Sequence, residues 1–205
     1  MLFRSYVPPD PLGEFIDDFW LYEDYAAAHS HERILPSGTF EMVFNLQEDE
    51  LRIYRPSDEV DCRRFSGALI SGPYAGPFMS DTKEEAAILG VHFKPGGASA
   101  VIGLPASELA NDHIDLAAIW GPAAIALREQ LCSLKEPSER FRLLEQALLK
   151  RFANHLGHHR ATRAGLDVLR HTHGRARIRD IARALGLSQR RFSDVFAAEV
   201  GLTGR

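Results

Sequence analysis

The stretch IRDIARALGLSQRRFSDVFAAEVG, residues 178–201, decides how the last part of this chain folds. The apolar residues of its first half recur at positions i, i+3, i+4 and i+7 and share one helical face: Ile178, Ile181, Ala182 and Leu185. Gly186 can end that helix with a positive φ, and Ser188 stands where the N-cap of a second helix belongs. The stretch therefore predicts two short helices joined by a tight turn, a helix-turn-helix.

The second predicted helix, residues 189–200, has an apolar side and a polar side. The apolar side is predicted to be buried and consists of Phe192, Val195, Phe196 and Val200. The polar side holds the candidate DNA-binding residues: Gln189, Arg190, Arg191, Ser193 and Asp194. A helix in the major groove reads bases mainly with its amino-terminal residues, and arginine and glutamine suit guanine and adenine. The pattern favours DNA binding, and a plain helical hairpin with a solvated polar face is the alternative.

Charge is divided unevenly along the 205 residues, which have a formal net charge of −4. Residues 150–205 hold 12 basic and 4 acidic side chains, a net charge of +8. Residues 1–149 hold 12 basic and 24 acidic side chains, a net charge of −12. A basic end joined to an acidic body predicts that the basic end meets a polyanion. Chance clustering of charge on solvated helices is the alternative.

Size and composition exclude several classes of protein. A chain of 205 residues with 45% apolar content suits one medium domain and one small domain. No apolar run approaches the ~18 residues of a membrane span, and the first residues have no apolar stretch long enough for a secretion signal. Cys62 and Cys132 stand far apart without companion ligands, which fits reduced thiols and a cytoplasmic location.

The first 115 residues are predicted to be β-rich. Alternating apolar residues predict strands near residues 40–46 and 88–93, and a further strand is predicted over residues 65–71. The polar run QEDE after the first of these predicts a hairpin to a strand that starts at Leu51. Residues 12–20, in contrast, have helical spacing. We therefore predict an α+β chain whose residues 1–115 form a small β-barrel or sandwich of cupin-like type.

Residues 116–156 are predicted to be a helical linker or a pair of dimerisation helices. Pro137 can start the longer helix from its first turn, and apolar residues then recur at helical spacing: Phe141, Leu144, Leu148 and Phe152. Leu143 and Leu149 widen this stripe, so a homodimer that packs through it is one arrangement that the sequence allows.

Neither catalysis nor a metal site is predicted. His29 and His31 have the spacing of a metal pair in a cupin barrel, but Leu35 and Pro36 occupy the place of the expected carboxylate, which favours an exposed loop. No grouping of nucleophile and base is readable from the spacing. Trp20 and other aromatic residues suit either a ligand pocket or a core, and core packing is the default interpretation. We therefore expect no enzyme activity and no cofactor.

Several stretches resemble a known family. Residues 178–203 resemble the first helix-turn-helix of AraC/XylS-family bacterial transcriptional regulators, and the residues that carry the resemblance are Ala182, Gly186, Ser188, Phe192, Phe196 and Gly201. LPSGTFEMVFNL, ISGPYAGP and LGVHFKPGGASAVIG, at residues 35–46, 70–77 and 89–103, resemble the N-terminal domain of an AraC-type subgroup. The resemblance implies a regulator that binds double-stranded DNA, with residues 160–205 as a partial DNA-binding domain. Residues 1–115 would then sense a small molecule or dimerise.

The sequence also departs from this family. Such regulators carry two helix-turn-helix units, and this chain is expected to be truncated after the first, so we predict weak DNA binding. By position, base reading falls to Arg190, Ser193 and Asp194, whose carboxylate suits cytosine N4, and phosphate contacts fall to Gln189 and Arg191. The alternatives are a stand-alone ligand-binding or dimerisation module without DNA binding and a cupin-like enzyme with a vestigial tail.

Overall fold

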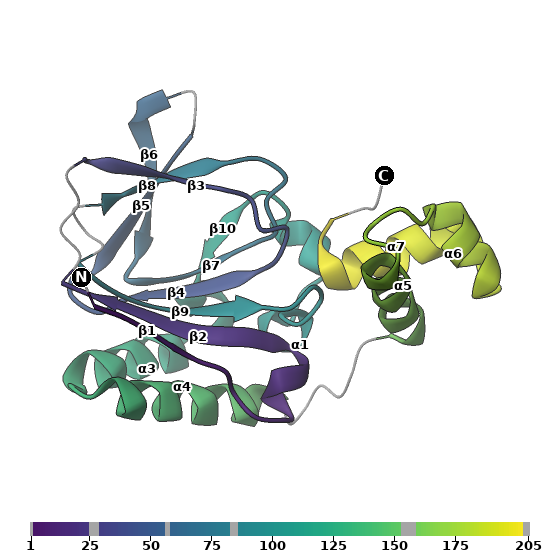
Figure 1. The fold of residues 1–205 in the computed structure, drawn as a ribbon. Helices are drawn as coiled ribbons and strands as arrows, with labels where there is room; N and C mark the ends of the chain where they lie inside the picture. Colours follow the sequence, from purple (N-terminus) through teal and green to yellow (C-terminus); the bar gives the residue numbers. More distant parts are fainter. Residues whose placement is uncertain (1, 25–28, 56–57, 83–85, 153–158, 203–205) are drawn as a thin grey trace.

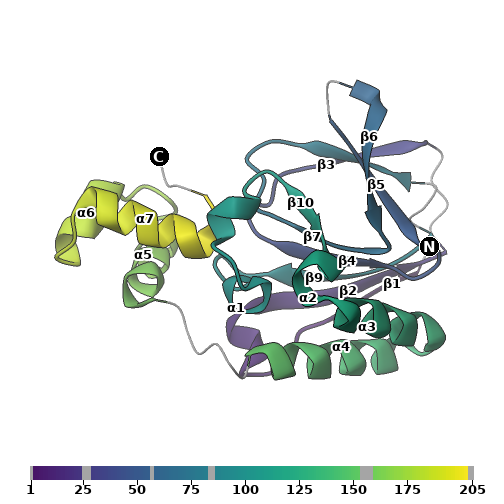
Figure 2. The ribbon, with the colours of Figure 1, turned by 180° about the vertical axis from the view of Figure 1, so that it is seen from behind.

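The computed structural model describes residues 2–24, 29–55, 58–82, 86–152 and 159–202 (Figures 1 and 2). Two antiparallel sheets face each other, and helices follow them in the chain. The larger sheet has the order β1 (Leu2–Tyr6), β2 (Ile16–Glu23), β9 (Ala87–Phe93), β4 (Glu41–Asn45), β7 (Ala68–Ser71) and β10 (His113–Asp115). The smaller sheet has the order β3 (His31–Ile34), β8 (Phe78–Asp81), β5 (Glu50–Arg55) and β6 (Asp58–Ser66). In the described part of the chain no strand pairing joins the two sheets, so the α+β class is confirmed and the barrel alternative is wrong.

The helices fall into two groups. The first comprises α1 (Ser99–Ile102), α2 (Leu116–Trp120), α3 (Pro122–Ser133) and α4 (Pro137–Phe152), with the short 3-10 turns η1 (Leu12–Glu14) and η3 (Ala106–Leu109). The second comprises α5 (Arg160–His171), α6 (Ile178–Ala184) and α7 (Gln189–Val200). Figure 1 shows α3 and α4 under the larger sheet and the second group at one side of the sheets.

Helix α4 covers the outer face of the larger sheet with the apolar residues that the sequence singled out. Phe141, Leu144, Leu148 and Phe152 are buried in the core that the sheet and helices share, as predicted. The Phe141 ring lies 5.8 Å from that of Tyr6 and 6.3 Å from that of Phe19, measured between ring centroids. Residues 116–152 therefore share one core with the strands.

The helix expected over residues 12–20 is wrong. Only η1 is helical there, and β2 begins at Ile16. Phe19 and Leu21 face the core under the sheet, whereas Trp20 belongs to a separate cluster on the face toward the smaller sheet. A strand buried on both faces shows no apolar–polar alternation. The helical spacing of the apolar residues was therefore a coincidence.

The hairpin expected between β4 and β5 is also wrong, because these strands lie in different sheets. The polar run between them carries the chain from one sheet to the other. The backbone amides of Gln47 and Glu48 donate to Oδ1 of Asn45 at 3.0 and 2.9 Å. Arg128 of α3 donates to the carbonyls of Asn45 and Glu48 at 2.8 and 2.7 Å. The expected strand 65–71 likewise divides at Gly67, where the chain returns to the larger sheet.

Helices α5, α6 and α7 enclose a core of their own. It consists of Ala161, Ile178, Ile181, Ala182, Phe192, Phe196 and Val200. Val195, which we predicted to be buried, is half-buried. Gly165 of α5 allows close packing, because a Cβ atom there would lie 2.6 Å from the Phe192 ring. The carboxyl end of α7 contacts η3, so this group rests against the β-rich part.

Candidate functional site

The turn between α6 and α7 has the features predicted from the sequence. Gly186 has a φ of +69°, a conformation that glycine adopts without a Cβ clash. The Oγ atom of Ser188 accepts a hydrogen bond from the backbone amide of Arg191 at 3.1 Å, so Ser188 is the N-cap of α7. The cap and the turn fix the direction in which α7 leaves α6.

The five predicted DNA-binding residues lie together on the first two turns of α7. Gln189, Arg190, Arg191 and Asp194 are exposed, and Ser193 is half-buried. Within the residues that the structure describes, no ion pair involves Arg190 or Arg191. Figures 1 and 2 show α6 and the adjoining end of α7 on the side of this group away from the sheets. The amino end of α7 is therefore largely exposed, and the contacts of its side chains with DNA stay predictions.

A cavity of about 580 Å³ lies between the two sheets. Its walls are mainly apolar and aromatic and include Trp20, Tyr22, Leu51, Ile53, Tyr74 and Phe78. This volume lies within the range of small-molecule sites, and so does the mixture of apolar walls with a few polar groups. Core packing was the default interpretation of the aromatic residues, and it holds for Trp20 and Phe78, which are buried but also line the cavity.

A row of polar residues crosses five strands of the larger sheet beside this cavity. Cross-strand pairing places Asp18 opposite His92, His92 opposite Glu41, Glu41 opposite Ser71 and Ser71 opposite His113. His92 contacts Asp18 through Nδ1 at 2.8 Å and Glu41 through Nε2 at 3.0 Å. Burial alone would lower the pKa of His92, but the hydrogen bonds and charges of Glu41 and Asp18 raise this pKa to about 9. At neutral pH the row therefore has an imidazolium between two carboxylates.

His113, at the other end of the row, is neutral. Burial lowers its pKa to about 4, and the Arg63 charge adds to this effect. Its Nδ1 lies 2.7 Å from the hydroxyl of Tyr74, and burial together with the Asp112 charge raises the pKa of that hydroxyl to about 12. Its Nε2 is buried and has no hydrogen-bond partner among the described residues. A neutral imidazole with a free ring nitrogen thus lies in the cavity wall.

Two more side chains of the cavity wall have an unpartnered polar atom. In the described part of the chain, neither Nε1 of Trp20 nor Oγ of Ser80 has a hydrogen-bond partner. The Trp20 indole lies flat on Gly90, where a Cβ atom would be 2.2 Å from the ring. Buried polar atoms without a partner each cost about 1–3 kcal/mol, which marks the cavity as a place where a bound molecule would add hydrogen bonds.

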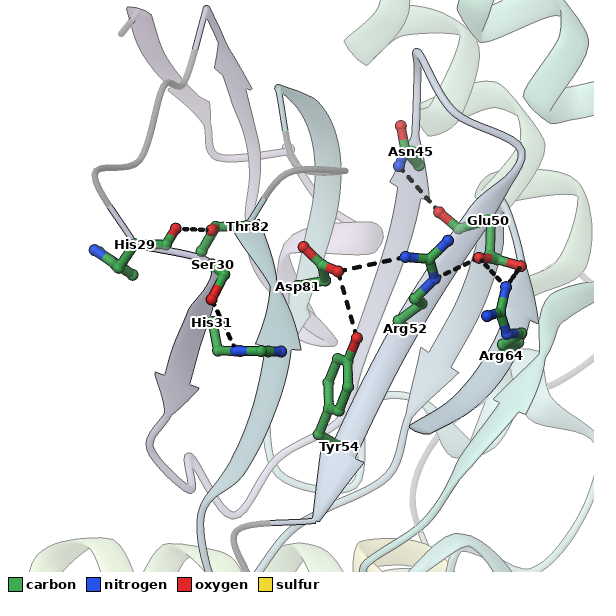
Figure 3. Close-up of polar contacts among 10 residues, drawn as sticks. All are labelled: His29, Ser30, His31, Asn45, Glu50, Arg52, Tyr54, Arg64, Asp81 and Thr82. Atoms are coloured by element: carbon green, nitrogen blue, oxygen red, sulfur yellow. Dashed lines mark hydrogen bonds and ion pairs between the residues drawn. The ribbon is translucent and has the colours of Figure 1, made fainter. Parts of the chain in front are cut away.

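The histidine pair belongs to a different environment (Figure 3). His31 is half-buried in β3, so the expected exposed loop holds only for His29. The His31 ring stands edge-on to Tyr54 at 4.5 Å, and its Nδ1 contacts Oγ of Ser30 at 3.1 Å. Asp81 lies opposite His31 in the ladder and interacts with the Tyr54 hydroxyl at 3.4 Å. Among the described residues, no group of three or more potential ligands could hold a metal ion.

None of the described helices is both long enough and apolar enough to cross a membrane.

Comparisons with known proteins bear on the β-rich part. A family model described as "Domain of unknown function (DUF6597)" matches residues 4–115, which end with β10. No curated protein matches the chain significantly. Among solved structures, the AraC-like transcriptional activator CuxR is similar with a TM-score of 0.30 and 13% sequence identity, over 98% of this chain and 82% of that chain.

Proposed function

This chain belongs to the DUF6597 family, and we propose that it is a DNA-binding transcriptional regulator of the AraC type. In this proposal α7 enters the major groove of double-stranded DNA, and the cavity between the sheets binds a small effector. The protein acts in the cytoplasm without catalysis or a cofactor. The observation that carries the proposal is the capped, exposed amino end of α7 with two arginines that form no ion pair with any described residue.

The distribution of charge supports the same surface. Further arginines in α6 and in the segment just before it are exposed: Arg175, Arg177, Arg179 and Arg183. The net charge of +8 over residues 150–205 suits a phosphate backbone, whereas the net charge of −12 over residues 1–149 would repel it. DNA would therefore approach the molecule from the side of α6 and α7.

Contacts at the base of α7 supply a route by which the cavity can influence DNA binding. Gly72 and Tyr74 line the cavity, and Pro73 between them lies so close to Gly201 that a Cβ atom on this glycine would be 2.4 Å from the proline ring. A second cavity loop, Ser37 to Thr39, approaches Leu202 through Gly38. A ligand that binds one arrangement of these loops more tightly than another would shift the position of α7.

This route predicts a difference between two glycine variants. Gly201→Ala is expected to lower the free energy of unfolding by about 1–2 kcal/mol more than Gly186→Ala, and to speed hydrogen exchange in residues 72–77. Both glycines have positive φ, at +89° and +69°, so both variants carry backbone strain. Only at Gly201 would the new methyl group meet Pro73 and the carbonyl of Ala106. If the two variants have equal free energies of unfolding and hydrogen exchange in residues 72–77 is unchanged, the proposed route is wrong.

The DNA-binding part is tested by fluorescence anisotropy with labelled duplexes, including sequences selected from a random pool. We expect binding that weakens steeply between about 50 and 200 mM salt, with a Kd of about 10⁻⁴–10⁻⁶ M at physiological salt. Arg190→Ala should change the preferred sequence, whereas Arg191→Ala should weaken binding to all sequences evenly. No binding at low salt would refute the DNA-binding function. Equal, sequence-independent losses of affinity in both variants would contradict the roles assigned to Arg190 and Arg191.

A stand-alone ligand-binding module is the second candidate, and the unpartnered Trp20, Ser80 and His113 atoms in the cavity wall favour it. It predicts small-molecule binding without any affinity for DNA. The two candidates therefore separate in the anisotropy measurement.

A further inference from the structure

We propose that the cavity between the sheets takes an organic cation, a protonated amine on an apolar or aromatic body, with Glu32 as its counter-ion. This inference deepens the ligand-binding part of the proposed function and does not depend on DNA binding. Apolar and aromatic walls would hold the body of the ligand. A pair formed by Glu32 and Ser80 would hold the ammonium group.

Glu32 and Ser80 are brought together by the smaller sheet. Glu32 of β3 lies directly opposite Ser80 of β8, and Ser80 lies opposite Ile53 of β5. Side chains directly opposite each other in a sheet project from the same face, and all three line the cavity. Glu32 is half-buried, and in the described part of the chain its carboxylate makes no hydrogen bond or ion pair. A partly buried carboxylate without a cation is an unused binding group.

The cations of the cavity, in contrast, already have partners. His92 lies between Asp18 and Glu41. Arg52 contacts Glu50 at 2.5 Å and Asp81 at 3.6 Å, as Figure 3 shows. The carboxylates that line the cavity therefore outnumber its cationic side chains, and the surplus charge is negative. An anionic ligand would meet this surplus without a free cation to neutralise it.

Ser80 provides an independent observation that favours a ligand at this place. Its side chain is 5% exposed, and its Oγ atom has no partner within the described residues. An ammonium group has three donors, and it would use the carboxylate of Glu32 and the hydroxyl oxygen of Ser80 at the same time.

The aromatic wall near Glu32 favours the same charge. Burial raises the pKa of the Tyr22 hydroxyl, and the charges of Glu32, Glu41 and Asp18 raise it further. Three carboxylates therefore act on this wall. The rings of Trp20 and Tyr22, which meet edge-on with their centroids 5.2 Å apart, also line the cavity, and aromatic rings attract a cation over their faces. The rim of the cavity includes two exposed apolar side chains, Phe3 and Leu35, which suit the body of an amphipathic amine.

The test uses three probes of similar size on the full chain, measured by isothermal titration calorimetry at pH 7. The probes are 2-phenylethylamine, 2-phenylethanol and 3-phenylpropanoate, which differ in charge. We expect the amine to bind about tenfold or more tightly than the alcohol, and the carboxylate to bind most weakly. Glu32→Gln should remove the tighter binding of the amine and should change the affinity for the alcohol by no more than about twofold. The matched control, Glu129→Gln on the exposed face of α3, should change neither the affinity for the amine nor that for the alcohol.

Three outcomes would overturn the inference. They are equal affinity for amine and alcohol, preference for the carboxylate, and binding by none of the probes at millimolar concentration. Thermal unfolding of Glu32→Gln checks that the variant is folded. Failure here leaves the affinity for DNA unaffected, and failure to bind DNA leaves the preference for the amine unaffected, so the two proposals are distinguishable.

Discussion

The double variant Arg190→Glu/Arg191→Glu is expected to bind duplex DNA about 100-fold more weakly than the unaltered chain at low salt. Both arginines are exposed on the first turn of α7 and make no ion pair within the described structure, so each is free to contact DNA. Charge reversal removes two attractive contacts and places two carboxylates against phosphates. Fluorescence anisotropy at about 50 mM salt measures the loss, and circular dichroism checks that α7 still forms.

A matched control carries the same change in net charge elsewhere. Lys135→Glu/Arg142→Glu alters two exposed cations on the α3–α4 side of the molecule. If long-range charge alone governs binding, the affinity of the control variant for DNA falls as far as that of the double variant. If α7 is the contact surface, the control keeps affinity within about threefold, because salt screens charges beyond about 10 Å. Equal losses for the two variants would contradict the placement of DNA on α7.

Arg140→Ala is expected to lower the free energy of unfolding by about 3–5 kcal/mol. Arg140 is a buried cation of α4, 8% exposed, and its Nη1 lies 2.5 Å from Oε1 of Glu23 in β2. Its Nε donates to the carbonyls of Leu134 and Leu131 at 3.0 and 3.3 Å. Truncation leaves a largely buried carboxylate and two carbonyl groups without this partner. Denaturation with urea, followed by circular dichroism, measures the change.

Arg142→Ala is the control for this prediction, because Arg142 lies on the exposed side of the same helix. Its effect should stay within about 0.5 kcal/mol, as for most surface substitutions. A loss below about 1 kcal/mol for Arg140→Ala would show that the pair with Glu23 does not hold α4 on the sheet.

Local patterns predicted several elements correctly. The helical spacing of apolar residues in α4, the cap at Ser188 and the alternation in β4 and β9 are local signals, and the structure agrees with these predictions. The same reasoning failed for β2, since a strand buried on both faces carries no alternation. It also failed at the QEDE turn, because a polar run marks a turn but not the sheet to which the next strand goes.

The candidate cavity could not be predicted from any local signal. Asp18 and His92 are 74 residues apart in the sequence. Glu32 and Ser80 belong to β3 and β8, and four other strands lie between these two in the chain. One sequence signal could have indicated the cavity: polar residues, such as Glu41 and His92, within otherwise apolar strands. Their partners depend on strand register, which long-range packing sets.

The order of residues along the chain was enough to predict the helix pair at its end, the charge division and the class of fold, because these depend on neighbours within one or two turns. Strand order, the passage of the chain between sheets, the cavity and the contact of Gly201 with Pro73 came from the packed structure alone. The physical reason is that side chains far apart in sequence meet only when two apolar faces pack together and exclude water. A short segment does not determine which face it will pack against.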